Sequence, residues 1–169
     1  ITRDVSKMAV GQVYYTPWCD ERGKIIDDGT VSRLREQTFP WTAADPNLRW
    51  FRQNAAGMKV SIDDISEEVA ALALQGPTSA RLLRAVSTAD IDRLKYFRVT
   101  QGTIGGIPVE ISRTGYTGDL GYEIWMSSRD AVRVWDVHMD RGIPFDVKPT
   151  GMLALDVARV EAGLLLIEV

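Results

Sequence analysis

The sequence predicts an α+β protein in which antiparallel sheets pack against helices. Short β-like runs separated by turn residues fill the first part of the chain, and helical patterns join further strands after it. A composition of 45% hydrophobic and 25% charged residues over 169 residues is typical of a globular protein with a sizeable core. We expect a small, mainly antiparallel β subdomain over 1–66 and an α/β sandwich-like subdomain over 67–169.

Turn residues separate the elements of the first subdomain. Asp20-Glu21-Arg22-Gly23 predicts a hairpin turn between two strands. Asp45-Pro46-Asn47 opens a short helix over 48–55, and Gly57 marks its end. The expected strands are 10–18, 24–34, 39–44 and 58–65.

The second subdomain begins with an apolar strand, 69–74, that feeds a helix. Pro77 suits the first position of this helix, which we expect over 78–86. Strands are expected at 96–102, 107–112 and 121–126, with Gly105-Gly106 turning between the first two. Ser127 and Asp130 predict a capped helix that ends near Arg141. A last helix, 151–162, carries an apolar face of Leu153, Val157 and Val160.

Charge and composition exclude several classes of partner. The net charge of −3 comes from 20 basic and 23 acidic residues without a basic run, which argues against nucleic acid. No apolar run reaches the roughly 18 residues of a membrane span, and no signal peptide is recognisable. Cys19 and His138 stand alone and are expected to be structural; no disulfide or metal spacing is present, so a cytoplasmic location fits best.

The two ends of the sequence predict that the chain is cut from a longer one. It starts without methionine and stops in the apolar run 164–169, which resembles a strand just beginning. Faces that would meet missing parts then make self-association of the fragment, as a homo-oligomer, an expectation.

The segment 113–123, Arg-Thr-Gly-Tyr-Thr-Gly-Asp-Leu-Gly-Tyr-Glu, is the strongest candidate for a ligand-binding loop. Its three glycines permit positive φ and close backbone approach. Tyr116 offers a flat ring with a hydroxyl, and Glu123 offers a bidentate acceptor for an amino-pyrimidine edge. Tyr116, Glu123 and Arg113 are therefore candidate cofactor-binding residues. The alternative is a plain glycine-rich hairpin.

Asp27 and Asp28 are the candidate catalytic residues. Neighbouring side chains of a strand point to opposite faces, so one carboxylate faces a cavity while the other faces solvent. Burial raises the pKa of a carboxyl group and suits it to hold or move a proton on a substrate amine. Which of the two faces the ligand is left open, and the alternative is that both are solvated at a sheet edge.

In order and spacing, these segments resemble the folate-binding aminomethyltransferase family. That family includes the T-protein of the glycine cleavage system, relatives among sarcosine and dimethylglycine oxidoreductases, and folate-dependent demethylases. The matching stretches are Val-Gly-Gln-Val-Tyr-Tyr-Thr (10–16), Asp-Glu-Arg-Gly-Lys-Ile-Ile-Asp-Asp (20–28), Ala-Leu-Gln-Gly-Pro (73–77), the segment 113–123 and Ala-Arg-Val-Glu-Ala-Gly-Leu (158–164).

The resemblance implies a cloverleaf of three domains, of which this chain carries the middle of the folate-binding part; the family's N-terminal segment and C-terminal barrel would be absent. It implies that tetrahydrofolate is the cofactor. Its pterin would be held by Glu123 near Tyr116, and Asp27 would sit near the folate N10. Two positions depart from the T-protein pattern: Leu155 replaces an arginine, and Thr42, also a candidate cofactor-binding residue, replaces an asparagine.

The resemblance also implies an enzyme, a tetrahydrofolate-dependent aminomethyl or methylene transferase of the glycine cleavage T-protein type, inactive as an isolated fragment. Its partners would be a small-molecule amine or methyl donor, or a carrier protein. The two departures leave open a folate-dependent O-, S- or N-demethylase of the same family. A non-catalytic folate-binding module is the third alternative.

Overall fold

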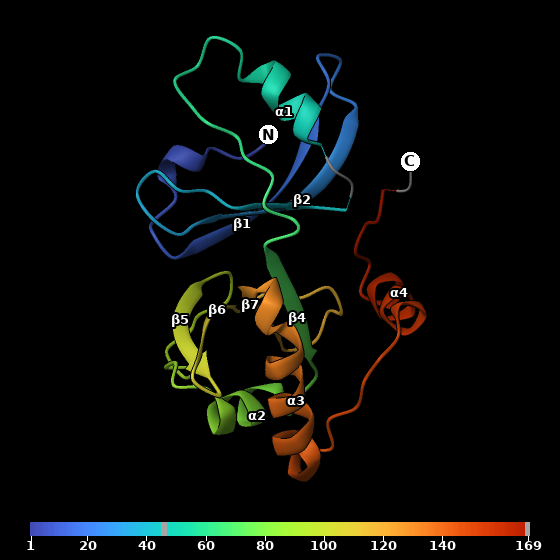
Figure 1. Cartoon of the computed structure of the whole chain (residues 1–169). Helices are drawn as coiled ribbons and strands as arrows, with labels where there is room; N and C mark the ends of the chain where they lie inside the picture. Colours follow the sequence, from blue (N-terminus) through green and yellow to red (C-terminus); the bar gives the residue numbers. More distant parts are fainter. Residues whose placement is uncertain (45–46, 168–169) are drawn as a thin grey trace. The chain divides into compact units, whose positions relative to one another are not determined.

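The computed structural model describes residues 1–44 and 47–167, and it confirms the predicted α+β class (Figure 1). The chain forms two compact units. Ile1–Ser66, joined by Ile167, make the first unit, and Glu67–Leu166 make the second. Each unit has its own antiparallel sheet.

The first unit is a three-stranded sheet in the order β1-β2-β3. A short 3-10 turn, Val5–Lys7, precedes the sheet, and helix α1 follows it. Asp20 closes the predicted hairpin turn, because one of its carboxylate oxygens accepts from the amides of Arg22 and Lys24, both at 2.9 Å. The elements are β1 (Gln12–Cys19), β2 (Ile25–Arg33), β3 (Trp41–Ala43) and α1 (Leu48–Asn54).

The strand predicted over 58–65 is wrong, since the structure has no regular element there. The carbonyl of Ile62 accepts instead from the Arg52 guanidinium, at 3.1 Å from Nη2. Met58 and Val60 are 64% and 61% exposed, so the apolar residues that suggested a strand have no core to enter. The start of the helix is described only from Asn47, because Asp45 and Pro46 lie outside the described residues.

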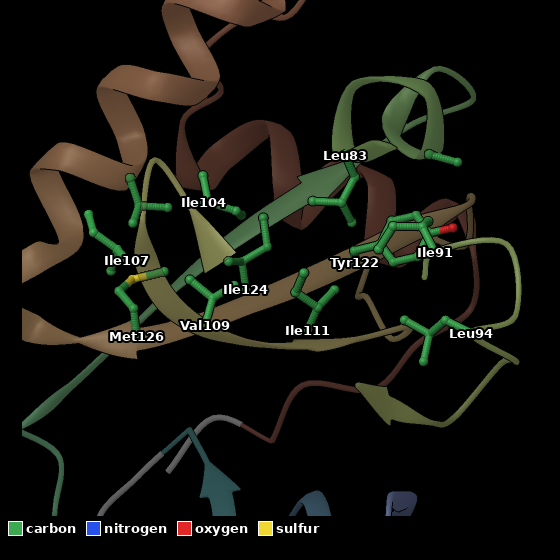
Figure 2. Packing of buried hydrophobic residues seen from close by; sticks show 12 residues of the cluster. Leu83, Ile91, Leu94, Ile104, Ile107, Val109, Ile111, Tyr122, Ile124 and Met126 are labelled. Atoms are coloured by element: carbon green, nitrogen blue, oxygen red, sulfur yellow. The ribbon is translucent and has the colours of Figure 1, made fainter. Parts of the chain in front are cut away.

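The second unit is a four-stranded antiparallel sheet in the order β4-β7-β6-β5. Helices α2 and α3 contribute Ala80, Leu83 and Val134 to a core on one face of this sheet (Figure 2). The elements are β4 (Val69–Gln75), α2 (Ser79–Val86), β5 (Val99–Ile104), β6 (Ile107–Ser112), β7 (Gly121–Ser127), the 3-10 turns Ser128–Asp130 and Ile143–Phe145, α3 (Ala131–Gly142) and α4 (Met152–Glu161).

Alternation along β7 divides the sheet into a core face and an opposite face. Tyr122, Ile124 and Met126 are buried in the core that Figure 2 shows. Gly121, Glu123 and Trp125 therefore point to the other face, away from α2 and α3. The sheet thus presents Glu123 on the face opposite to α2 and α3.

Three predicted element boundaries are corrected. Helix α2 begins at Ser79 with Thr78 as its N-cap, so Pro77 precedes the helix instead of opening it. Ser127 makes no capping bond to α3, which begins at Ala131 after a 3-10 turn; the Ser128 hydroxyl donates to the Glu67 carbonyl. Strand β5 begins only at Val99, because Phe97 has a φ of +55° and cannot continue a strand.

The ends of the second unit also differ from expectation. Residues 164–167 form no strand, and 168–169 lie outside the described residues. Helix α4 has the predicted apolar stripe, but Leu153 is 85% exposed, and Val157 and Val160 are each 59% exposed. Self-association of the chain stays a prediction.

Candidate functional site

Asp27 is a buried carboxylate near the beginning of β2. Only 3% of its surface is exposed. The Asn47 amide donates to Oδ2 at 2.6 Å, and the backbone N–H of Asp28 donates to Oδ1 at 2.7 Å. Trp18, in turn, donates from its indole nitrogen to the Asn47 side-chain oxygen at 3.4 Å. Each oxygen of Asp27 is therefore oriented by one donor and keeps acceptor capacity for another.

An aromatic cluster lies beside Asp27. Trp18 is the register partner of Asp27 across the β1–β2 hairpin, so the two side chains share a face. The rings of Trp41 and Phe51 stack at 4.4 Å, and Trp18 meets both of them at 5.6 and 5.3 Å. This cluster joins α1 to the sheet and reduces the access of water to the carboxylate from that side.

Asp28 and Thr42 lie on the other face of this sheet. Asp28 is half-buried and follows Asp27 in the alternation of β2, so the two predicted catalytic residues point to opposite faces, as the sequence indicates. Thr42 is opposite Thr30, and their hydroxyl oxygens are 2.8 Å apart. Thr42 therefore shares a face with Asp28 and not with Asp27, and its hydroxyl already serves the β2–β3 pairing.

In the second unit, Glu123 is half-buried on β7, with its carboxylate held by two hydroxyls. Thr114 donates to Oε2 at 2.5 Å, and the hydroxyl of Ser112, the register partner of Glu123, lies 3.4 Å from the same oxygen. The two hydroxyls are 2.7 Å apart, and both residues are buried. Within 1–44 and 47–167, no hydrogen bond reaches Oε1, so that oxygen keeps its acceptor capacity.

The glycine loop uses its three glycines in two different ways. Only Gly118 has a positive φ, +74°, and a Cβ there would lie 2.5 Å from the Ala162 Cβ. Gly115 and Gly121 do not have positive φ; a Cβ at either position would overlap the end of the Gln75 side chain, which would then have to shift. Tyr116, at the centre of the loop, is partly buried.

Arg113 is placed differently from the other predicted cofactor contacts. Its Nη1 donates to the Leu94 carbonyl at 3.2 Å, and its backbone pairs with Phe97 and Arg98. Its Nε is buried and has no partner within the described chain. The structure records no hydrogen bond or ion pair between Arg113 and Glu123 in that part of the chain. Its guanidinium anchors the loop before β5.

Four site residues were not predicted from the sequence: Asn47, Gln75, Ser112 and Thr114. Gln75 and Thr114 each lie inside a stretch that carries the family resemblance, which is a signal that points to them. Ser112 ends a strand and faces Glu123 only through the strand register, and Asn47 reaches Asp27 across 20 residues. Neither of these two contacts has a local sequence signal.

His138 and Cys19, the other two residues that the sequence singled out, are buried and partly buried. His138 is 5% exposed, and its Nδ1 lies 2.7 Å from the Val134 carbonyl oxygen. Burial lowers the pKa of His138, and the hydrogen bond to Val134 opposes this only in part. Cys19 is a free, partly buried thiol. Across 1–44 and 47–167, no group of three His, Cys, Asp or Glu residues is suited to a metal ion, and no helix has the length and apolarity to cross a membrane.

Comparisons with known proteins identify the family of the chain. The family model of the GCVT N-terminal domain matches residues 1–169. The aminomethyltransferase of Halothermothrix orenii is 40% identical over 167 residues, which is 96% of this chain and 46% of that protein. The trimethylamine-oxide aldolase of Ruegeria pomeroyi is 39% identical over 175 residues, covering 97% of this chain and 22% of that protein.

The fold has a close counterpart among solved structures. The glycine cleavage system aminomethyltransferase T from Bartonella henselae superposes with a TM-score of 0.79 at 26% identity, covering 97% of this chain and 44% of that one. The chain thus spans less than half the length of these relatives. Because the family match extends over every residue, this chain belongs to the GCVT N-terminal domain family.

Proposed function

We propose that the protein is a tetrahydrofolate-dependent one-carbon transferase of the glycine cleavage T-protein type. It would pass an aminomethyl or methylene group from an amine donor to tetrahydrofolate, with Glu123 holding the pterin. The observation that carries the proposal is the geometry of the Glu123 carboxylate. The buried hydroxyls of Thr114 and Ser112 contact Oε2, and Oε1 has no partner within the described chain. Names of the relatives and the family match support the same activity.

The residues of the second unit fit the pterin of tetrahydrofolate. An amino-pyrimidine presents adjacent N–H donors, and an ionised carboxylate is the acceptor that matches them. Thr114 and Ser112 keep Glu123 from rotating, so the orientation of the acceptor is set before a ligand arrives. When bound, tetrahydrofolate supplies the nucleophilic nitrogens that accept the one-carbon unit. Tyr116 would contribute a ring contact.

Asp27 would stabilise positive charge that develops on the donor during transfer. It is a carboxylate in a site with little water, and Asn47 and the Asp28 amide hold it in one orientation. A preorganised charge of this kind acts on a cationic transition state without reorganising. Asp28 is the weaker candidate, because it lies on the opposite face. Thr42 and Arg113 stay predicted cofactor contacts.

The donor of the one-carbon group would be a small amine or methyl compound, or a carrier protein. The likeness to an aldolase that is named for trimethylamine oxide makes that compound a donor to assay beside aminomethyl donors and a carrier protein. We propose a cytoplasmic location, in keeping with the single cysteine. Activity is assigned to the intact protein.

Titration of the intact protein with tetrahydrofolate tests the pterin site. Glu123→Gln removes the charge and replaces one acceptor oxygen by a donor, and hydrogen bonds to a charged group contribute about 1.5–3 kcal/mol each. We expect the dissociation constant measured by calorimetry to rise at least about 30-fold. Glu110→Gln is the matched control, because Glu110 lies on the same sheet face, opposite Trp125, and bonds only to Gln101 in the described chain.

The two variants separate the site from general charge effects. Unchanged affinity in Glu110→Gln together with weak binding in Glu123→Gln supports the assignment. Full affinity after the Glu123 change would show that the pterin is held elsewhere. No binding by the unchanged protein would overturn the proposed function itself.

A further inference from the structure

We infer that Gln75 is a positioning residue for the Glu123 carboxylate and that its amide sets the affinity of the site for its ligand; the inference rests on the proposed function. Gln75 is the last residue of β4, and its register partner is Gly121, two residues before Glu123. Its side chain therefore lies on the face that carries Glu123.

The Gln75 amide fixes both backbone segments that carry the Glu123 carboxylate and its partner. Its Nε2 donates to the carbonyl of Tyr122 at 3.2 Å and lies 3.5 Å from the carbonyl of Thr114. Tyr122 directly precedes Glu123, and Thr114 supplies the hydroxyl that holds Oε2. One amide group thus links the donor and the acceptor of the hydrogen bond that orients the carboxylate.

The other end of the same amide holds the loop that carries Tyr116. The Thr117 hydroxyl donates to the Gln75 Oε1 at 3.2 Å. Every polar atom of the Gln75 side chain is therefore used, and all three partners belong to the segment between Thr114 and Tyr122. A residue that only filled space would not need this match of one acceptor and two donors.

The two glycines let the Gln75 amide lie directly against the loop backbone. A Cβ at Gly115 or at Gly121 would overlap the Gln75 amide. A side chain at either position would therefore have to displace the amide from the carbonyls of Thr114 and Tyr122. This close fit explains two of the three glycines that the sequence shows in the loop.

The inference predicts a specific pattern of affinities in the intact protein. Gln75→Glu keeps the size of the side chain but places an oxygen against the carbonyls of Thr114 and Tyr122. Thr117→Val removes only the hydrogen bond to the Gln75 Oε1. Gln75→Glu should therefore weaken tetrahydrofolate binding more than Thr117→Val does. We expect about 10- to 100-fold weaker binding for Gln75→Glu and less than about 5-fold for Thr117→Val. Gln101→Ala, on the same sheet, is the matched control.

A pair of substitutions distinguishes positioning from a purely structural role. Gly121→Ala alone should weaken binding, because its methyl group displaces the Gln75 amide. In Gln75→Ala/Gly121→Ala the space is open, so the second substitution should cost much less than it does in the presence of Gln75. Turnover at saturating folate should change less than KM in each variant, since Gln75 acts on the binding of the pterin and not on Asp27.

Melting temperatures of all variants serve as the check on folding. If the Gln75→Glu protein had the melting temperature of the unchanged protein and also its affinity for tetrahydrofolate, the inference would be overturned. A loss of thermal stability without a change in affinity below the melting transition would overturn it as well. If the unchanged protein bound no tetrahydrofolate, the proposed function would fail first, and the ligand role of Gln75 with it.

Discussion

At the scale of single residues, Asp27 shows how a strand separates two identical side chains. Asp27 is 3% exposed and takes hydrogen bonds on both oxygens, whereas Asp28 is half-buried on the other face. Because Asp27 is buried and accepts hydrogen bonds from Asn47 and Asp28, the alternative of two solvated aspartates at a sheet edge does not hold for Asp27. The proposed catalytic role therefore falls to Asp27, whose carboxylate has fixed partners.

Asp27→Asn tests this distinction. The asparagine keeps one acceptor oxygen but places an N–H₂ group against either the Asn47 amide or the Asp28 N–H, so one buried donor loses its partner. We expect a loss of about 1–3 kcal/mol in the free energy of unfolding. In the intact protein, folate affinity should persist while the transfer rate falls.

Urea unfolding and single-turnover assays measure the two effects. Asp28→Asn is the matched control, with an expected change within about 0.5 kcal/mol, because that side chain is not buried. Equal losses in both variants would contradict the assignment of Asp27 as the functional carboxylate.

At the scale of elements, the sequence predicted the strands that alternate and pair locally. The hairpin at 20–23 and the strands around Gly105-Gly106 and the glycine loop are all present, because turn residues fix their registers. The strand expected at 58–65 is absent: Met58 and Val60 are exposed, and the Ile62 carbonyl accepts from Arg52, a contact that periodicity does not reveal. Asn47 and Gln75 were missed for a similar reason: their partners are 20 and up to 47 residues away.

Gly29→Ala tests the pairing of β2 with β3. A Cβ at this position would overlap the Thr42 carbonyl oxygen and lie 2.9 Å from its carbon, and this is backbone that cannot rotate away. We expect β3 to be displaced and the unit to lose at least about 2 kcal/mol of stability. The backbone N–H of Thr30, which donates to Thr42, should exchange with solvent faster.

Hydrogen exchange and chemical unfolding report on this change. Ser32→Ala, on the same strand, is the control and should leave the Thr30 amide protected. An unaltered exchange rate in Gly29→Ala would mean that β3 can pair with a wider separation than the structure shows.

At the scale of the whole molecule, the predicted catalytic and cofactor-binding residues are divided between two compact units. Asp27 belongs to the unit of Ile1–Ser66, and Tyr116 and Glu123 belong to the unit of Glu67–Leu166. The sequence indicated Asp27, the pair Tyr116 and Glu123, and the family, because each motif is local. It did not indicate that the apolar stripe of α4 would be exposed. Residues Leu153, Val157 and Val160 are exposed in this chain.

The pH dependence of stability should differ between the two units. Burial lowers the pKa of His138, so the unfolded chain takes up a proton more readily than the folded one. The contribution of neutral His138 to the free energy of unfolding is complete above the ordinary histidine pKa of about 6.5. It is lost as the pH falls through the lower pKa of the folded state, at up to about 1.4 kcal/mol per pH unit.

Unfolding of the chain and of His138→Leu between about pH 5 and 7 measures this contribution. His138 is the single histidine in the sequence, so the slope in this range should flatten in the variant. The change should be confined to the transition of the second unit. An identical slope in both proteins would show that His138 is accessible to protons in the folded state.

The close fit of Gln75 against Gly115 and Gly121 has a consequence for how this family evolves. While the glutamine is present, neither glycine can acquire a side chain without displacing it. Once the glutamine is replaced by a small residue, both positions are released from that constraint. A family member with a side chain at 115 or 121 should therefore either lack the glutamine or hold its amide in another position.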